Sequence, residues 1–259
     1  MMAKAWAIGM VVVREMIRRK DFYVLFILTA VLTVGLGGIS IFNDTRVVRY
    51  LKEICLSLIW VSALVISVTA AARQIPSERE HRTLFPLLAK PVSRWEVILG
   101  KYLGCLAASA LALAVFYLFF TLVSLSRERD ALLLNHVYAW VLHCGFASVV
   151  ISMALLGSLL ISTPPANATL CFLTASSILF LGRHLYQLSQ SLAEPLKTLV
   201  QVVYFTMPHL EFFDVRDLVI HNHPALPLPA VLGALGYSGV YSALFLLAAS
   251  LLFKRRPVI

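Results

Sequence analysis

Long runs without Asp, Glu, Lys or Arg alternate along the chain with short clusters of charge. The uncharged runs cover residues 22–43, 54–72, 102–126, 131–182 and 230–253. A helix of about 20 apolar residues crosses the hydrocarbon core of a bilayer. The run 131–182 is long enough for two spans, and Thr163-Pro164-Pro165 divides it because consecutive prolines stop a helix.

This pattern predicts an all-α membrane protein with six transmembrane helices in a single domain over residues 1–259. The expected spans are about 22–43, 54–72, 102–126, 136–162, 167–186 and 230–253. Residues 3–20 mix apolar and basic side chains and predict an amphipathic helix lying on the membrane surface. Residues 44–53 are expected to form a short polar loop, and residues 192–205 a second amphipathic segment.

Composition supports a membrane protein, since 60% of the residues are hydrophobic and only 14% are charged. The net charge of +9 does not indicate nucleic-acid binding, because the basic residues flank the apolar spans and suit contact with anionic lipid. Four cysteines lie apart inside apolar runs without a Cys-x-x-Cys pair, so metal or redox chemistry at these thiols has little support.

The distribution of Lys and Arg predicts the orientation of the chain. Placing the N-terminus inside puts fourteen of these residues on the inner face and eight on the outer face. Cytoplasmic loops carry the excess of positive charge in membrane proteins. Both termini and the charged stretch 75–101 are therefore expected in the cytoplasm, and an even number of spans agrees with this.

The stretch 75–101 is the longest densely charged part of the chain, and it lies between two expected spans. Ser77-Glu-Arg-Glu80 predicts a capped helix start, and Leu84 and Leu87 follow at helical spacing. Lys90-Pro91 ends this helix, since the residue before a proline avoids helical geometry. Ser93, with Glu96 three residues on, is expected to cap a second helix that leads directly into the third span.

Residues 77–101 resemble the cytoplasmic loop of ABC-2 type permeases, the membrane subunits of type V-like ABC exporters. The resemblance rests on Ser-Glu-Arg-Glu-x-x-Thr-Leu-x-x-Leu-Leu-Ala-x-Pro-Val-Ser-Arg-x-Glu-Val-x-Leu-Gly-Lys. It extends to the whole chain through the amphipathic N-terminal helix, the six spans and the longer outer segment before the last span. Residues 207–216 also resemble that outer segment in some members of the family.

The resemblance implies a coupling helix between spans 2 and 3 that docks in a cleft on an ABC ATPase subunit. It also implies short outer-leaflet helices within residues 192–217, before span 6, that cap the transport path. The expected ATPase contacts are Glu78, Arg79, Glu80, Arg82, Leu84, Leu87 and Arg94. Leu84 and Leu87 fit equally well against the protein's own spans. The expected outer-gate residues are Pro208, His209, Phe212 and Phe213.

The expected function is that of the permease subunit of an ATP-driven exporter of an amphiphilic or unidentified substrate, in a bacterial cytoplasmic (inner) membrane. Gly100-Lys101 is followed by Tyr102 and does not complete a phosphate-binding loop, so this chain is expected to bind no cofactor and to be no enzyme. ATP and Mg²⁺ are expected on the partner, in an assembly of two ATPases with a homodimer of permeases or a pair of related permeases. A non-transporting scaffold or assembly factor, and a membrane-embedded enzyme, are the alternatives.

Several other residues are candidates for chemistry. A metal site is conceivable in the outer segment, although a solvated loop suits the irregular spacing better; the residues concerned are His209, Glu211, Asp214, Asp217, His221 and His223. His143 and His184 near the span interiors are expected to bond to neighbouring helices. Gly233, Gly236 and Gly239 suit close packing of the last span, within the chain or across a dimer.

Overall fold

The computed structural model describes residues 2–18, 23, 26–27, 29–31, 45–80, 93–127, 132–221 and 223–255. Within these ranges the regular structure is helical, with no strand. The elements are α1 (Met2–Arg18), α3 (Thr45–Ala72), α4 (Pro76–Glu80), α6 (Arg94–Arg127), α7 (Leu133–Leu160), α8 (Pro164–Ser191), α9 (Leu196–Thr206), η1 (Leu210–Phe213), α10 (Arg216–Ile220) and α11 (Leu228–Arg255).

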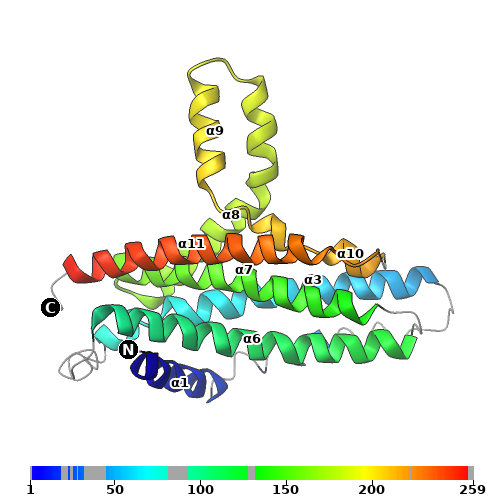
Figure 1. Cartoon of the computed structure of the whole chain (residues 1–259), viewed down its shortest axis with the longest axis horizontal. Coiled ribbons are helices and arrows are strands. Elements are labelled where there is room, and N and C mark those ends of the chain that lie inside the picture. Colours follow the sequence, from blue (N-terminus) through cyan, green and yellow to red (C-terminus); the bar gives the residue numbers. More distant parts are fainter. Residues whose placement is uncertain are drawn as a thin grey trace.

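Five stretches of the described chain are long and apolar enough to cross a membrane, and they centre on α3, α6, α7, α8 and α11. Helices α3, α6, α7 and α11 run along the long axis of the molecule as a bundle (Figure 1). Helix α7 packs against the other three and against α8, and most of its side chains are buried. Helices α7 and α11 coincide to within a few residues with the expected spans 136–162 and 230–253.

The expected first span, 22–43, lies mostly outside the described residues. Phe26 within it packs edge-on against Phe116 and Phe119 of α6, with ring centroids 5.5 and 5.9 Å away. The chain breaks before the fifth span as expected, but the break lies at residues 161–163, and Pro164 and Pro165 begin α8 instead of lying in the turn. Proline is favourable at this first position, where the backbone N–H would have no intrahelical partner.

The expected polar loop over 44–53 is wrong for residues 45–53, which form the first turns of α3. Leu51 and Lys52 are buried there, whereas Tyr50 and Glu53 are exposed. The polar residues of this segment therefore belong to the continuous helix α3 and not to a loop before it.

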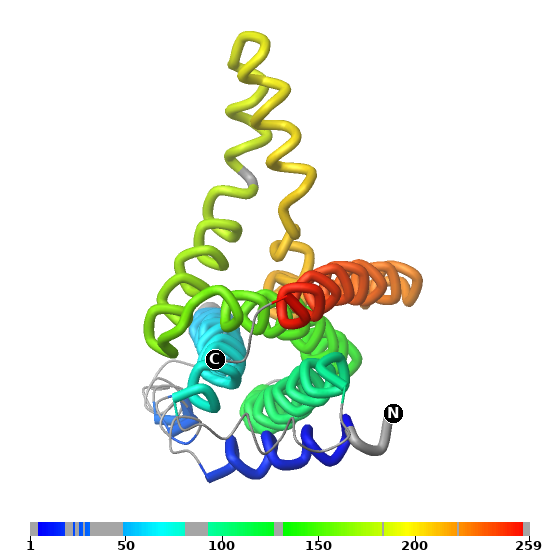
Figure 2. Tube along the Cα trace, turned by 90° about the vertical axis from the view of Figure 1, so that its left-hand side faces the viewer, coloured from blue at the N-terminus to red at the C-terminus, as the bar shows by residue number. Residues whose placement is uncertain are grey.

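Helix α1 forms where a helix was expected, with Ala5, Gly9 and Val12 buried and Trp6 and Val11 exposed. In Figure 2, which looks along the bundle, α1 runs across the bundle helices. Its backbone touches that of α6. A Cβ added to Gly104 would lie 2.6 Å from the Gly9 carbonyl oxygen, and one added to Gly100 would lie 2.7 Å from that of Ala5. Small residues four apart on both helices permit this approach.

The second half of α8 and the whole of α9 form a hairpin that projects away from the bundle (Figures 1 and 2). Helix α9 packs along α8, and none of its residues is buried. That the short helices within 192–217 cap the transport path stays a prediction, since α9 contacts α8 and buries none of its residues. The part that does pack on the bundle is η1 with α10, where Leu210, Phe213, Val219 and Ile220 are buried.

The expectation of close packing through the glycines of the last span within the chain is also wrong. A Cβ added at Gly233, Gly236 or Gly239 would meet nothing within 4 Å. Helix α11 instead packs on α7 through another face, where the Ser148 and Ser242 hydroxyls lie 2.7 Å apart. The glycine face of α11 is open in the single chain.

Candidate functional site

At the junction between α3 and α4 one backbone hydrogen-bond donor is missing, the N–H of residue 76. In a continuous helix the Ala72 carbonyl would accept from the N–H of residue 76, but Pro76 has none. The flanking bonds remain, because Ser77 N–H donates to the Arg73 carbonyl and Arg79 N–H to that of Ile75, both at 3.0 Å. Ser77 therefore lies inside this hydrogen-bonding pattern, and its expected role as the cap of a new helix is wrong.

Asn167 of α8 replaces the missing donor. Its Nδ2 donates to the Ala72 carbonyl at 2.8 Å and to the Ala154 carbonyl of α7 at 3.2 Å. The side chain is fully buried, and a Cβ at Gly157 would lie 2.4 Å from its Oδ1, so only glycine leaves it room. One amide thus joins the end of α3 to α7 and α8.

A buried ion pair holds α4 against α6. Lys101 Nζ donates to Glu78 Oε1 at 2.7 Å and to the Gln74 carbonyl and Oε1 at 3.0 and 3.3 Å. The Lys101 side chain is 2% exposed and that of Glu78 is 28% exposed. Such a buried ammonium is tolerable only because it is paired and hydrogen-bonded. The pair attaches α4 to the start of α6.

The start of α6 is capped as the sequence predicts. Ser93 N–H and Oγ donate to Glu96 Oε2 at 2.7 and 2.9 Å, and Glu96 N–H donates to Ser93 Oγ at 3.2 Å. Arg94 then reaches the end of α11, where its Nη1 donates to the Phe253 carbonyl and, at 3.3 Å, to that of Lys254. Its guanidinium also lies 5.3 Å from the centroid of the Phe253 ring.

The residues predicted to contact an ATPase have different surroundings. Glu78 and Arg94 bind within the chain, Arg79 is half-buried, and Glu80 at the end of α4 is exposed. Arg82, Leu84 and Leu87 lie outside the described residues. Helices α1 and α4 and the end of α11 each contact the start of α6, so they share one end of the bundle (Figure 1). Sequence reasoning missed Lys101 and Asn167.

The predicted outer-gate residues differ in burial: some are buried in the bundle and others lie on an exposed aromatic surface. Phe213 is fully buried, and its ring faces Gly145 so closely that a Cβ there would lie 3.0 Å away. Phe212 is 54% exposed and packs edge-on against Tyr237. His209 N–H donates to the Tyr237 hydroxyl at 2.7 Å, and Pro208 precedes it as a buried residue.

Arg216 joins this segment to α3. Arg216 donates from Nε and Nη2 to the two Asp214 carboxylate oxygens, both at 2.8 Å, and from Nη1 to Ser57 Oγ at 3.0 Å. Its guanidinium also lies over the Trp60 ring, 5.1 Å from the centroid. Although burial alone raises the pKa of Asp214, the hydrogen bonds and charge of Arg216 lower it below its usual value, and Asp214 in turn raises the pKa of Arg216.

The outer segment is packed rather than a solvated loop, and within the described residues no three His, Cys, Asp or Glu gather as a metal site would require. His143 is fully buried and its Nδ1 lies 2.8 Å from the Tyr117 hydroxyl of α6, which confirms the expected bond to a neighbouring helix. His184 is exposed on α8.

The comparisons with known proteins agree with this arrangement. The family described as ABC-2 family transporter protein matches residues 5–258, almost the whole chain. No curated protein gives a significant match. The chain therefore belongs to the ABC-2 transporter family and is a multi-pass membrane permease component of an ABC transporter, a kind of subunit that pairs with an ABC ATPase.

Proposed function

We propose that this permease is the membrane half of an exporter and that its ATPase docks at α4 and the charged stretch that follows it. The main support is the attachment of α4 to the bundle through Glu78–Lys101 and through Asn167 at the Ala72 carbonyl. A short helix fixed at both of these points cannot move without moving α3 and α6. Glu80, exposed at the end of α4, is available to a soluble partner.

Helix α3 provides the path from the docking site to the outer segment. Its last residue, Ala72, is held by Asn167, and its outer half carries Ser57 and Trp60, which hold Arg216. From Ser57 to Ala72 is about 22 Å at 1.5 Å per residue. Closure of the ATPases would shift α4, tilt α3 and release Arg216, so that Phe213 leaves Gly145. This is a two-state change in which binding energy favours one packing over another.

Two features support the finer parts of the proposal. Apolar side chains exposed on α8 and α9, among them Phe180, Leu199 and Phe205, suit an amphiphilic cargo that moves along a lipid-facing surface. The open glycine face of α11 suits a second permease copy, since small residues allow close helix contact. We place the complex in a bacterial inner membrane with both termini cytoplasmic, because α1 ends with Arg18 and α11 with Lys254 and Arg255, and positive charge gathers on the cytoplasmic side of membrane proteins.

The test is ATPase coupling in a reconstituted complex. The chain is purified with the ATPase that accompanies it from its native membrane, and hydrolysis is measured with and without the permease. Glu80→Lys should abolish most of the stimulation while membrane insertion stays normal. Glu194→Lys makes the same change at an exposed site on the α8–α9 hairpin and should leave stimulation intact. Equal behaviour of the two variants would refute docking at α4.

A further inference from the structure

Helices α3, α6 and α7 pack against one another, and several buried polar atoms between them lack a hydrogen-bond partner within the described residues. The atoms that lie away from the helix ends are Trp60 Nε1, Ser67 Oγ, Ser109 Oγ and His143 Nε2. Ser67, Ser109 and His143 are at most 1% exposed. Buried polar groups without a partner are costly, and they are rare in folded proteins. The junction of the three helices therefore needs something that completes these bonds.

The two serine hydroxyls lie at the same level of the bundle. Cys105 Sγ of α6 lies 3.7 Å from the Ala70 carbonyl of α3, and the two helices run antiparallel. The next turn of α6 carries Ser109, and the turn of α3 that faces it carries Ser67. Another buried helical serine, Ser152, donates to the carbonyl three residues back in its own helix at 2.8 Å. Ser67 and Ser109 do not make this bond, so their hydroxyls remain to be satisfied across the junction.

Trp60 Nε1 and His143 Nε2 belong to the same junction, nearer the start of α3. Trp60 precedes Ser67 by seven residues, about 10 Å along the helix. Its ring stacks on Phe146 of α7 with centroids 5.6 Å apart, and Phe146 follows His143 by about one turn. The other imidazole nitrogen of His143, Nδ1, lies 2.8 Å from the Tyr117 hydroxyl of α6. In either neutral tautomer Nε2 is left with one hydrogen bond to make.

Water is the ligand that suits this set of atoms. The serine hydroxyls both donate and accept, the indole N–H donates, and the imidazole nitrogen does one or the other according to its tautomer. The four groups are a pair of hydroxyls, an indole and an imidazole, without the carboxylate that a hard metal cation would require. A water molecule donates and accepts, and buried waters in proteins typically make about three hydrogen bonds to such groups.

We infer that internal water molecules occupy the junction of α3, α6 and α7. One water lies between the Ser67 and Ser109 hydroxyls, and another accepts from Trp60 Nε1 and bonds to His143 Nε2. A bridging water is nearly as good a partner as a direct hydrogen bond. It also exchanges its partners without the helices having to separate, so the contact of α3 with α6 and α7 can rearrange.

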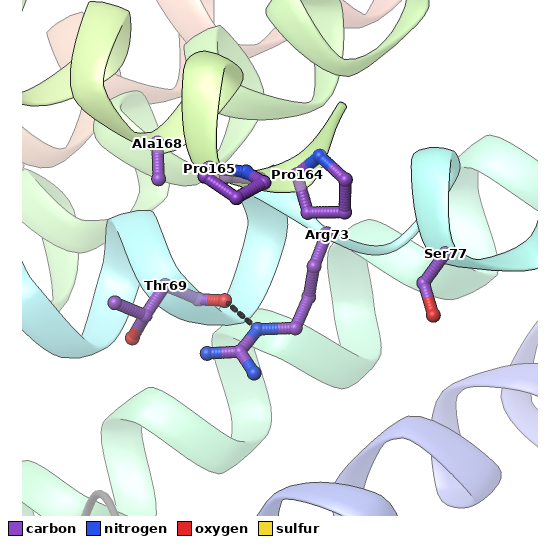
Figure 3. A pocket seen from close by; sticks show the side chains of 7 residues that line it. Thr69, Arg73, Ser77, Pro164, Pro165 and Ala168 are labelled. Carbon is purple, nitrogen blue, oxygen red and sulfur yellow. Dashed lines mark hydrogen bonds between the residues drawn. The ribbon is translucent and has the colours of Figure 1, made fainter. Parts of the chain in front are cut away.

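The water sites bear on the movement of α3. Direct hydrogen bonds hold this helix at Ala72 and at Ser57, and between these points its two unpartnered polar groups bond through water. Figure 3 shows the end of α3 beside a pocket of about 320 Å³, with Pro164 and Pro165 of α8 also lining it. Helix α3 thus has open space toward α8 and exchangeable bonds toward α6 and α7. This consequence rests on the proposed function, whereas the water sites do not.

X-ray radiolytic labelling of the permease alone, in nanodiscs, tests the water at Trp60. Radiolysis of an internal water yields hydroxyl radicals that oxidise the side chains beside it, and mass spectrometry locates the product. Trp140 is a matched control, because it is also half-buried but its Nε1 donates to the Ala110 carbonyl at 3.2 Å. Trp60 should be oxidised several fold faster than Trp140. Equal rates at the two tryptophans would overturn the assignment of water to Trp60.

Alanine variants test the water between the serines through the thermal unfolding midpoint of the permease alone. Ser67→Ala and Ser109→Ala should each lower the midpoint, because the water and the remaining hydroxyl lose a partner. The double variant should lower it by less than the sum, since both partners are removed together. Ser152→Ala, which removes a bond within one helix, should change it less than either single variant. A higher midpoint in both single variants would overturn the inference, because removal of an unbonded hydroxyl stabilises a dry junction. Neither test uses the ATPase, so a failure of docking at α4 would leave both results unchanged.

Discussion

Replacing Lys101 with Met tests the attachment of α4 to the bundle. The substitution keeps the length and apolar stem of the side chain but removes the ammonium, which donates to Glu78 and to both Gln74 oxygens. Breaking a buried ion pair from one side costs about 3–5 kcal/mol. Because the Glu78 side chain is 28% exposed, water can solvate the remaining carboxylate, and we expect a loss of about 2–3 kcal/mol in unfolding free energy.

Glu78→Gln should cost less, about 1 kcal/mol, because the amide oxygen still accepts from Lys101 and both Gln74 acceptors remain. The double variant should lose about 1–2 kcal/mol less than the sum of the single losses, since the pair is removed as a unit. The assay is denaturant unfolding in detergent, followed by helical circular dichroism, for the wild-type chain and all three variants. Strict additivity would refute a direct Glu78–Lys101 interaction.

Three further predictions concern the other contacts. Asn167→Ala should lower the unfolding free energy by about 1–3 kcal/mol, because the Ala72 carbonyl loses its donor; denaturant unfolding measures this, and an unchanged midpoint would contradict it. Gly104→Val should displace α1 and expose it to protease, since its Cβ would lie 2.6 Å from the Gly9 carbonyl oxygen, whereas Gly236→Val, with open space around it, should resist as the wild type does. In the folded protein the pKa of the Asp214 carboxyl, paired with Arg216, is lowered. The pair should therefore stabilise the outer segment above pH 3.8, the ordinary pKa of the carboxyl, and lose that contribution as the pH falls through the folded pKa. Hydrogen exchange over 210–220 should rise only in acid, and Asp214→Asn should reproduce the rise at neutral pH.

The helices of the bundle were predictable because hydrocarbon selects for uninterrupted apolar runs and leaves charge at their ends. The break at Pro164-Pro165 and the cap of Ser93 by Glu96 followed from local chemistry, which depends on residues near in sequence. The helical start of α3 was missed because Arg49, Lys52 and Glu53 resemble a polar loop when their helical register is ignored.

The contacts that define the candidate site depend on residues distant in sequence. Lys101 meets Glu78 across 23 residues, and Asn167 meets Ala72 across 95, so neither pairing has a local signal. One signal was present and unused: Ala5 and Gly9 match Gly100 and Gly104 in four-residue spacing, the pattern of close helix packing. A second signal was Pro76: because proline has no N–H, the Ala72 carbonyl lacks its usual helical donor, and a donor from another helix could have been expected.

The most direct test of ATPase docking at α4 is labelling of a cysteine at position 80. Cys55, Cys105 and Cys171 are buried, and Cys144→Ala removes the half-buried fourth thiol, so a membrane-impermeant maleimide will report on Glu80→Cys. In inverted membrane vesicles, which expose the cytoplasmic face, this cysteine should react rapidly without the ATPase and be protected once the ATPase is bound. Reaction only in right-side-out vesicles, or equal reaction with and without the ATPase, would contradict the proposed site of coupling.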